Sequence, residues 1–516
     1  MRRRTILSGV IMLLATAVLL CGCSKDDQSG TNENKDRYTV TFSLIDLYGE
    51  ERNNNGDNSD RILKMIGDYC DVNVKPVWVP NDTLADRNSN YLLSPGQSPD
   101  IVSWGGTITG EVISAAKVGA FVDLNDYVWD VEKYPNLAGM SKDVAANLTV
   151  NGKLIGIPRT RVIGREGLSY RQDWAEKLGV TLPENATPED VYKMLYAFTY
   201  QDPDGNGIDD TIGMEMTSYT GVFDIIQTWF GCGNGWQFVD GRLMPVWTTD
   251  EYFEAVDYIK RLYDEGLMPK DFALRPTDTW SNGCKSGENG VFIDVLDGGK
   301  RIWQFFEAEE SFTPSVIDNT KAAEMVLYGA VNGRTLATAG YNGFFTLSAA
   351  TLDTPEKIEA ALRLLDKLND REMLILTQYG IEGIHYVMDG ELLVDTDKND
   401  SSLSGDYLGL NQMLPYLPST EAAVVPVLED KFSKAQNEAY TKASHYAISN
   451  PALAYLVQSG TYALEGDGFD KNIQNLRNKY ICGAITKEEF VSALHKVRTD
   501  GYDQIIIEVN NAYNAK

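Results

Sequence analysis

Residues 38–47 read YTVTFSLIDL, an alternation of apolar and polar side chains whose period of two predicts a β-strand. Residues 61–70, RILKMIGDYC, repeat apolar side chains at helical spacing. Residues 72–79, VNVKPVWV, and 100–104, DIVSW, again have the character of strands. A β-α-β-β order of this kind predicts an α/β layer with a largely parallel sheet.

The N-terminus predicts export from the cytoplasm. Arg2-Arg3-Arg4 precede an uncharged apolar run at 6–20, which suits a signal peptide and is shorter than the ~20 residues that cross a bilayer. The following Leu20-Cys21-Gly22-Cys23 resembles a bacterial lipobox, in which Cys23 would carry lipid, palmitate included, and become the first mature residue. An uncleaved anchor over residues 5–23 is the alternative. Either would hold the protein at the outer face of the cytoplasmic membrane.

The region after Cys23 predicts a tether to a large body. Residues 24–36, SKDDQSGTNENKD, contain no apolar side chain and should stay flexible. The expected organisation is a signal peptide over 1–22, a lipid-anchor cysteine and tether over 23–36, and a body too long for one core. The net charge of −28 argues against nucleic acid or an anionic membrane surface as partner.

Four cysteines remain beyond the leader: Cys70, Cys232, Cys284 and Cys482. They are far apart in the sequence and show no metal-ligand spacing. Four cysteines are too few for a disulfide scaffold in a chain of this length. Buried thiols and one or two bridges both remain open.

Residues 202–210, DPDGNGIDD, form the sharpest chemical motif. Oxygen side chains recur at loop positions 1, 3, 5 and 9, and a carbonyl is available at position 7, so the candidate ligands are Asp202, Asp204, Asn206, Ile208 and Asp210. This pattern matches the first three quarters of an EF-hand loop and predicts structural Ca²⁺, although Gly213 stands where the loop has glutamate. A solvated turn stabilised by its own side chains is the alternative.

Further motifs stand in a fixed order around this loop: 151–158 reads NGKLIGIP, 170–174 YRQDW, 187–189 TPE and 379–386 YGIEGIHY. Together they resemble extracellular solute-binding proteins of bacterial ABC transporters, in particular the large oligosaccharide-binding lipoprotein branch of family 1. The resemblance extends over nearly the whole mature chain.

The resemblance implies an α/β fold of the periplasmic-binding-protein type II-like kind, with two α/β lobes, a hinge and an interlobe ligand cleft. By analogy the first lobe takes 37–157 plus 328–400, and the second, with the calcium loop, takes 158–327 plus 401–516. It further implies a monomer that captures an oligosaccharide by hinge closure and delivers it to the permease transmembrane subunits of an importer. Alginate-binding members carry a comparable calcium loop, with an acid where this chain has Thr211.

Sugar chemistry suggests which side chains would line such a cleft. Sugars present flat apolar faces ringed by hydroxyls, so aromatic platforms with hydrogen-bonding neighbours are expected. Candidates beside glycine-rich or loop-forming segments are Trp104, Trp229, Trp236, Trp280, Tyr341 and His385. Packing inside a lobe is the alternative for each of them.

A local basic cluster runs against the overall acidity: Arg159, Arg161, Arg165 and Arg171 fall within thirteen residues. Guanidinium groups pair carboxylates and sulfates in bidentate fashion, so the cluster could select a uronic or sulfated sugar, and Arg159 is the leading candidate if the ligand is charged. Pairing with the chain's own acids is the interpretation that the sequence favours.

Two other classes compete with a binding protein: a secreted polysaccharide-degrading hydrolase or lyase, and a surface glycan adhesin. A hydrolase needs only two suitably separated carboxylates, which no sequence pattern locates. The three histidines stand alone, and the sequence contains no GxSxG, HExxH or GxxxxGK[ST] motif. We therefore expect a binding protein without catalytic residues.

Overall fold

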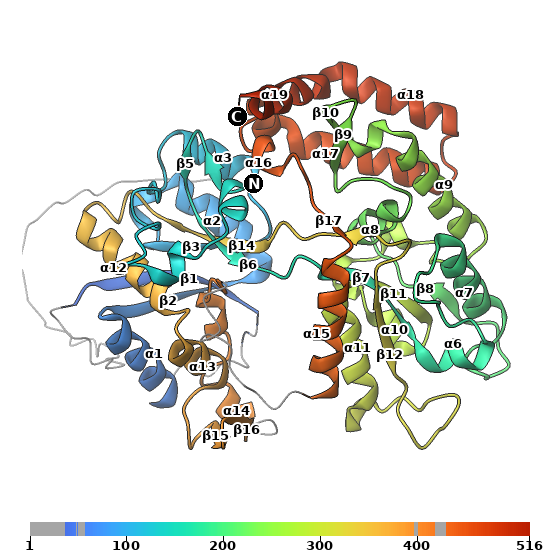
Figure 1. Cartoon of the computed structure of the whole chain (residues 1–516), viewed down its shortest axis with the longest axis horizontal. Helices are drawn as coiled ribbons and strands as arrows, with labels where there is room; N and C mark the ends of the chain where they lie inside the picture. The colour runs from blue at the N-terminus through green and yellow to red at the C-terminus, as the bar shows by residue number, and fades with distance from the viewer. Residues whose placement is uncertain (1–36, 48, 50–56, 397–400, 418–429, 516) are drawn as a thin grey trace, which may run out of the picture.

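The computed structural model describes residues 37–47, 49, 57–396, 401–417 and 430–515. The predicted signal peptide, the predicted lipid-anchor residue Cys23 and the predicted tether lie outside these residues. Within the described part, no helix is long and apolar enough to cross a membrane. Figure 1 shows two lobes side by side, with α15 standing beside α11 near the middle of the molecule and α17, α18 and α19 along one edge.

The first lobe is built on a five-stranded sheet of order β2-β1-β3-β14-β6. β1 runs parallel to β2 and β3, whereas β14 is antiparallel to β3 and β6. The predicted α/β layer is therefore confirmed, with one antiparallel strand inserted from far along the chain. The strands are β1 (Thr39–Asp46), β2 (Asn73–Pro80), β3 (Ile101–Trp104), β14 (Tyr341–Leu347) and β6 (Ile157–Thr160).

The second lobe is built on a four-stranded sheet of order β12-β7-β11-β8. β7 is antiparallel to both of its neighbours, and β11 is parallel to β8. The strands are β12 (Met325–Gly329), β7 (Glu166–Arg171), β11 (Asn289–Val295) and β8 (Ile212–Met214).

Helices cover both sheets (Figure 1). Those of the first lobe are α1 (Asp57–Cys70), α2 (Leu84–Leu93), α3 (Gly110–Lys117), α4 (Pro135–Ala138), α5 (Lys142–Ala146), α12 (Pro355–Lys367), α13 (Arg371–Tyr379) and α14 (Ser401–Ser404). Those of the second lobe are α6 (Gln172–Leu178), α7 (Pro188–Tyr200), α8 (Gly221–Trp229), α9 (Asp250–Asp264), α10 (Asn282–Ser286), α11 (Leu296–Glu307), α15 (Lys431–Ser444), α16 (Leu453–Leu456), α17 (Gly460–Ile481), α18 (Lys487–Val497) and α19 (Asp503–Asn514).

Short strand pairs complete the structure. β13 pairs with β17 in parallel, and the other three pairs are antiparallel. They are β4 (Thr149–Val150) with β5 (Lys153–Leu154), β9 (Trp236–Val239) with β10 (Arg242–Pro245), β13 (Thr335–Leu336) with β17 (Ala447–Ile448), and β15 (Tyr386–Asp389) with β16 (Leu392–Asp395).

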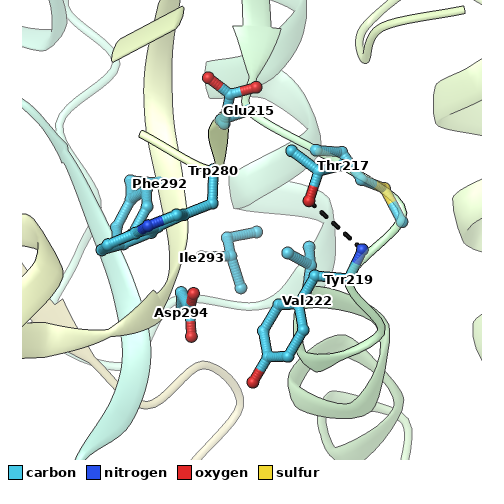
Figure 2. Close-up of a pocket in the computed structure, with 9 residues that line it drawn as sticks. Glu215, Thr217, Tyr219, Val222, Trp280, Phe292, Ile293 and Asp294 are labelled. Carbon is cyan, nitrogen blue, oxygen red and sulfur yellow. Dashed lines mark hydrogen bonds between the residues drawn. The ribbon is translucent and has the colours of Figure 1, made fainter. Parts of the chain in front are cut away.

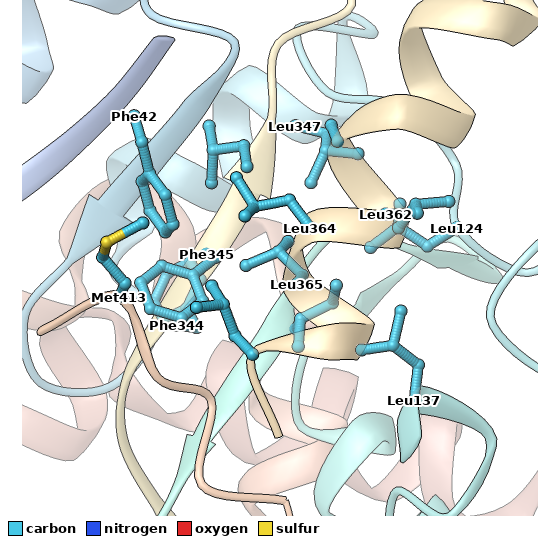
Figure 3. Packing of buried hydrophobic residues seen from close by; sticks show 14 of the residues in the cluster. Phe42, Leu124, Leu137, Phe344, Phe345, Leu347, Leu362, Leu364, Leu365 and Met413 are labelled. Atoms are coloured by element: carbon cyan, nitrogen blue, oxygen red, sulfur yellow. The ribbon is translucent and has the colours of Figure 1, made fainter. Parts of the chain in front are cut away.

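Each lobe has its own hydrophobic core, as a chain of this length requires. In the first core, Phe42 of β1 packs edge-on against Phe345 of β14, with ring centroids 5.1 Å apart. Figure 3 shows Leu364 and Leu365 of α12 beside these rings, together with Met413 from a segment near the end of the first lobe. In the second core, Trp174 and Phe198 are fully buried and meet edge to face.

The boundaries between the two lobes differ from those that the family resemblance implied. β6 pairs with β14 as far as Thr160, so the first lobe extends past 157. β12 pairs with β7 as far as Gly329, so the second lobe extends past 327. Leu410–Met413 packs in the first core, although 401–516 was expected in the second lobe. The first two crossings therefore run over 161–165 and 330–340, and the third connection, between Leu417 and Asp430, lies outside the described residues.

The cysteines are free thiols, which settles the alternative left open by the sequence. Cys70, Cys232 and Cys284 are buried, and Cys482 is exposed. Burial raises the pKa of Cys70 and that of Cys232 to about 12. These buried thiols behave as small apolar core residues.

Candidate functional site

A cavity of about 1010 Å³ lies where the two lobes face each other, beside the first two crossing segments. We call it the interlobe cleft. Arg159 and Tyr416 line it from the first lobe, the crossing segment 161–165 forms part of its wall, and α11 and α15 line it from the second lobe. Its volume is at the upper end of the range, about 300–1,000 Å³, typical of small-molecule sites, so it accommodates a ligand of several rings.

The lining of the interlobe cleft is strongly basic. Five basic residues face a single acidic one, Asp297: they are Arg159, Arg161, Arg165, Lys300 and Arg301. Asp297 is already engaged, because Arg165 donates to its two oxygens at 2.8 and 2.9 Å and Arg301 donates to Oδ2 at 2.8 Å. Tyr440 donates a further hydrogen bond to Asp297 Oδ1 at 2.9 Å. The lining therefore keeps an excess of positive charge.

Arg159 and Arg161 form no ion pair with any described residue. Arg159 is only 4% exposed, and its Nε donates to the Leu414 carbonyl at 3.3 Å. The Arg161 guanidinium donates to the Thr160 carbonyl at 2.8 Å and lies 5.4 Å from the centroid of the Tyr416 ring. Burial, followed by repulsion from Arg161, lowers the pKa of Arg159 to about 10, so the group stays charged at neutral pH.

The basic cluster seen in the sequence thus divides into two pairs with different roles. Arg165 and Arg171 are paired with the chain's own acids, Arg165 with Asp297 and Arg171 with Asp173, the latter pair being 3% and 5% exposed. Within this cluster of four, Arg159 and Arg161 are the two that have no carboxylate partner among the described residues. The buried Oε1 of Gln436, which also lines the cleft, has no hydrogen-bond partner in that part of the chain.

A small acidic pocket adjoins the cleft at the carboxyl ends of β8 and β11 (Figure 2). Glu215, Asp294 and Trp280 line it, and the Trp280 ring lies 5.1 Å from the ring of Phe292. The guanidinium of Arg301, which lines the cleft, lies 5.3 Å from the centroid of the Trp280 ring. Trp280 is partly exposed. Because it lines the acidic pocket and also lies beside Arg301 of the cleft lining, it stands between the two sites.

The carboxyl groups in and near this pocket have raised pKa values. Burial raises the pKa of Asp294 to about 6 and that of Glu215 to about 7. Burial and then the nearby Asp294 raise the pKa of Glu166 to about 8. Glu166 also interacts electrostatically with Arg165 and Asp297 of the cleft. Sequence reasoning missed Glu166 and Asp294; their position at the ends of adjacent strands, facing a lobe boundary, is the signal that could have found them.

The 202–210 loop follows α7, whose start has the Thr187–Asp190 capping box. Asp202 accepts from the backbone N–H groups of Gly205 at 2.9 Å and Gly207 at 3.2 Å. The Asn206 side-chain amide donates to Asp204 at 2.7 Å and to Asp210 at 3.3 Å.

The side chains of this loop offer the hard oxygen donors that Ca²⁺ prefers. The neutral Asn206 amide donates to two of the carboxylates, and the cationic neighbour is Lys177, whose Nζ donates to the carbonyls of Asp202 at 3.0 Å and Pro203 at 3.2 Å. Burial raises the pKa of Asp204, and the nearby Asp210 and Asp202 add to the effect. No group of three or more His, Cys, Asp or Glu side chains among the described residues is arranged to hold a metal. Thr211 is turned away, because its hydroxyl donates to the Phe198 carbonyl at 2.8 Å.

Comparison with known proteins decides the family. No family model matches the chain. Over 508 residues, 97% of each chain, it is 30% identical to lipoprotein LipO of Bacillus subtilis (strain 168). The chain belongs to the extracellular solute-binding proteins of bacterial ABC transporters. A second relative of this solute-binding protein, the polygalacturonan/rhamnogalacturonan-binding protein YtcQ of the same organism, is 28% identical over 98% of this chain and 97% of its own.

Solved structures confirm the type II-like fold of two α/β lobes. An extracellular solute-binding protein from Bifidobacterium longum subsp. infantis has a TM-score of 0.68 and 19% identity, covering 93% of this chain and 99% of its own. An EF-hand mutant of the substrate-binding protein FusA from Streptococcus pneumoniae, in complex with fructo-nystose, has a TM-score of 0.62 and 16% identity, covering 92% and 99%. These named relatives are binding proteins.

The solute-binding protein brings few of the predicted aromatic residues to its cleft. Trp104 is 7% exposed; its Nε1 donates to Thr346 Oγ1 at 2.8 Å and its ring stacks on Phe344. Tyr341 is 2% exposed in the same core. Trp104 and Tyr341 therefore complete the packing of the first lobe, because their strands run through its sheet, and neither lines the interlobe cleft.

The remaining candidates are distributed in the same way. Trp229 packs in the second core, and Trp236 stacks on Tyr502 there with ring centroids 6.3 Å apart. His385 is fully buried in the first lobe; its Nδ1 accepts from Ile381 N–H at 2.9 Å and its Nε2 lies 3.3 Å from Asp406. Of the seven predicted ligand-binding residues, Arg159 lines the cleft and Trp280 stands beside it.

Proposed function

We propose that this solute-binding protein captures an oligosaccharide bearing carboxylates or sulfates in the interlobe cleft and delivers it, intact, to the permease subunits of an ABC importer. The observation that carries the proposal is the pair of guanidinium groups in the cleft lining, Arg159 and Arg161, that form no ion pair with a described residue. Arginine pairs such anions in bidentate fashion. The name of the relative YtcQ, which specifies binding of polygalacturonan, supports an acidic ligand.

Capture proceeds by hinge closure of a monomer. Arg159 belongs to the first lobe, and Lys300 and Arg301 belong to the second, so an acidic ligand held by all three contacts both lobes. Such a ligand stabilises the closed arrangement by its greater affinity for it. A thermal-shift screen of the chain from Ser24 against neutral, uronic and sulfated oligosaccharides tests the proposal. A rise in Tm confined to the acidic glycans is expected, and a rise confined to the neutral ones contradicts it.

The pH dependence of binding follows from the carboxyl groups beside the cleft. The raised pKa values, about 8 for Glu166 and about 6 for Asp294, mean that these groups lose protons and gain negative charge as pH rises from 6 to 9. Added negative charge repels an acidic ligand, whereas Arg159, with a pKa of about 10, stays mostly protonated. Affinity for oligogalacturonate should therefore fall several-fold over this range in calorimetric titrations. The variant Glu166→Gln should flatten the trend, and affinity that rises with pH would refute it.

We propose further that the 202–210 loop binds structural Ca²⁺ through the side chains of Asp202, Asp204, Asn206 and Asp210 and the carbonyl of Ile208. Rotation of the Asn206 amide would bring its oxygen toward the carboxylates in place of its hydrogens. The ion would then fix the end of α7. The EF-hand in the name of the FusA mutant structure supports a related loop in the family.

Removing calcium should destabilise the folded protein. At a Ca²⁺ concentration of 100 Kd the ion contributes about 2.7 kcal/mol, so a chelator should lower Tm by several degrees, and excess Ca²⁺ should restore it. The variant Asp204→Asn should reduce this response, while Asp240→Asn, in an exposed turn of the same lobe, should keep it. A Tm indifferent to chelator, with no metal in the purified protein, would disprove the site.

We also propose that Cys23 carries the lipid that anchors the mature protein to the outer face of the cytoplasmic membrane. The relative LipO is a lipoprotein and aligns over 97% of this chain. Incorporation of labelled palmitate that is lost in Cys23→Ser is the expected result. Labelling that persists in this variant would favour another mode of attachment.

A further inference from the structure

A second cavity, of about 250 Å³, lies inside the second lobe and shares no lining residue with the interlobe cleft. We call it the lobe-2 pocket. Helices α8 and α17 form its walls, together with Trp236 at the start of β9 and Trp247 in the short 3-10 turn after β10. The function proposed for the cleft makes no use of this pocket.

Arg477 of α17 is the central polar group of the lobe-2 pocket. It is 5% exposed, and its guanidinium lies 3.8 Å from the centroid of the Phe223 ring. The buried Nε has no hydrogen-bond partner among the described residues, although other atoms of the guanidinium interact with the side chains of Tyr252 and Asp224. No ion pair forms at Arg477 with any residue that the structure describes. A buried N–H without a partner costs roughly 1–3 kcal/mol, more when charged, which a bound acceptor would recover.

Acceptors line the same pocket. Burial raises the pKa of Asp224 and that of Asp470 to about 6, and Arg477 partly opposes the effect at Asp224. Tyr462 donates to Asp470 Oδ2 at 3.4 Å. Gln474 adds an amide that can both donate and accept. Donors and acceptors are therefore mixed around one small space.

Apolar faces complete the lobe-2 pocket. The ring centroids of Trp236 and Trp247 lie 6.3 and 5.0 Å from that of Tyr502, so all three rings are held rigidly. Each of them lines the pocket. A rigid aromatic wall beside mixed donors and acceptors suits a ring that has an apolar C–H face and hydroxyls at its edge.

We propose that the lobe-2 pocket binds one neutral sugar ring, separately from the ligand of the cleft. The pocket is smaller than the ~300–1,000 Å³ of most ligand sites, which favours a monosaccharide over an oligosaccharide. Asp224 interacts electrostatically with both Arg477 and Asp470, so the charges are intermixed. An ionic or zwitterionic ligand would meet like charge in such a site, whereas hydroxyls pair with either sign.

Calorimetric titration and ligand-observed NMR of the intact mature chain with D-galactose, L-rhamnose and D-glucose test this proposal. At least one should bind saturably with one equivalent. Gln474→Trp, which fills the pocket from a partly exposed position, should weaken that binding at least tenfold, and Gln474→Ala is the smaller change should the larger one disturb folding. Arg161→Ala, in the cleft, should leave it unchanged.

The outcomes separate the lobe-2 pocket from the cleft. Monosaccharide binding that survives both Gln474 variants but disappears in Arg161→Ala belongs to the cleft and overturns the proposal. Absence of binding by all three sugars, or binding of α-amino acids in their place, also overturns it. None of these results bears on whether an acidic oligosaccharide binds the cleft, which is titrated separately.

Discussion

Replacing Arg161 by alanine should weaken binding of an acidic oligosaccharide by roughly 30- to 1,000-fold, or about 2–4 kcal/mol. The guanidinium lies in the cleft lining, and burial lowers its pKa, which indicates that it has lost part of its hydration. It forms no ion pair with the described residues, so a ligand carboxylate would be its first. Calorimetric titration with an oligogalacturonate measures the loss.

Two further variants make this result specific. Arg161→Lys keeps the charge but loses the bidentate geometry, so it should recover only part of the affinity. Arg242→Ala removes an exposed arginine of β10 in the second lobe, outside the cleft lining, and should bind like the wild type. If Arg161→Ala weakened a neutral oligosaccharide equally, the guanidinium would be a general cleft contact and its proposed role in recognising acidic sugars would be wrong. Unchanged Tm would show that folding is preserved.

Replacing Arg171 by methionine should lower the free energy of unfolding by about 3–5 kcal/mol. Arg171 donates to both oxygens of Asp173 at 2.9 and 2.8 Å, and both side chains are buried. Its guanidinium lies 4.7 Å from the Trp174 ring centroid and 5.0 Å from that of Phe306. Without it, Asp173 would stay buried with no cationic partner.

Urea unfolding measures this effect, and a double variant serves as control. Arg171→Met combined with Asp173→Asn removes both charges and should recover much of the lost stability, because a buried neutral pair avoids the cost of an unpaired ion. The Val316 N–H that donates to Asp173 at 3.0 Å keeps an acceptor in the asparagine oxygen. A loss below about 1 kcal/mol in the single variant would mean that water reaches Asp173.

Local sequence patterns predicted the first lobe's sheet well. The alternation in 38–47 became β1, and the short segment ending at Trp104 became β3. The sequence TPE at 187–189 likewise coincides with the start of α7, where Thr187 and Asp190 form a capping box. These features depend on neighbours within a few residues, which is the range over which periodicity and capping act.

Features that depend on distant pairing were harder to predict. β14 lies between β3 and β6 in the first sheet, although it follows β6 by about 180 residues in the sequence. Its pairing with β6 extends the first lobe to Thr160, beyond the expected boundary at 157. The burial of Trp104 has the same cause. Its place at the end of a strand predicted an aromatic platform for a sugar ring, but Thr346 and Phe344 of the distant strand β14 bury it.

The cleft residues illustrate the same limit. Arg159 and Arg161 stood out in the sequence because they oppose the overall charge. The sequence analysis singled out Arg159, but it did not separate Arg161 from Arg165 and Arg171. The distinction comes from Asp297 and Asp173, which occupy particular places around each guanidinium. Tyr440 of α15 joins Asp297 from 143 residues away, a contact that no local pattern encodes.

Calorimetric titration of the wild-type chain from Ser24 onward with a defined oligogalacturonate, beside a neutral oligosaccharide of equal length, tests the central claim most directly. The account predicts one equivalent of the acidic ligand bound and returned intact, with affinity that decreases as salt concentration rises because the contacts are ionic. The neutral oligosaccharide should bind much more weakly. Equal or tighter binding of the neutral ligand, or cleavage of the acidic one, would contradict it.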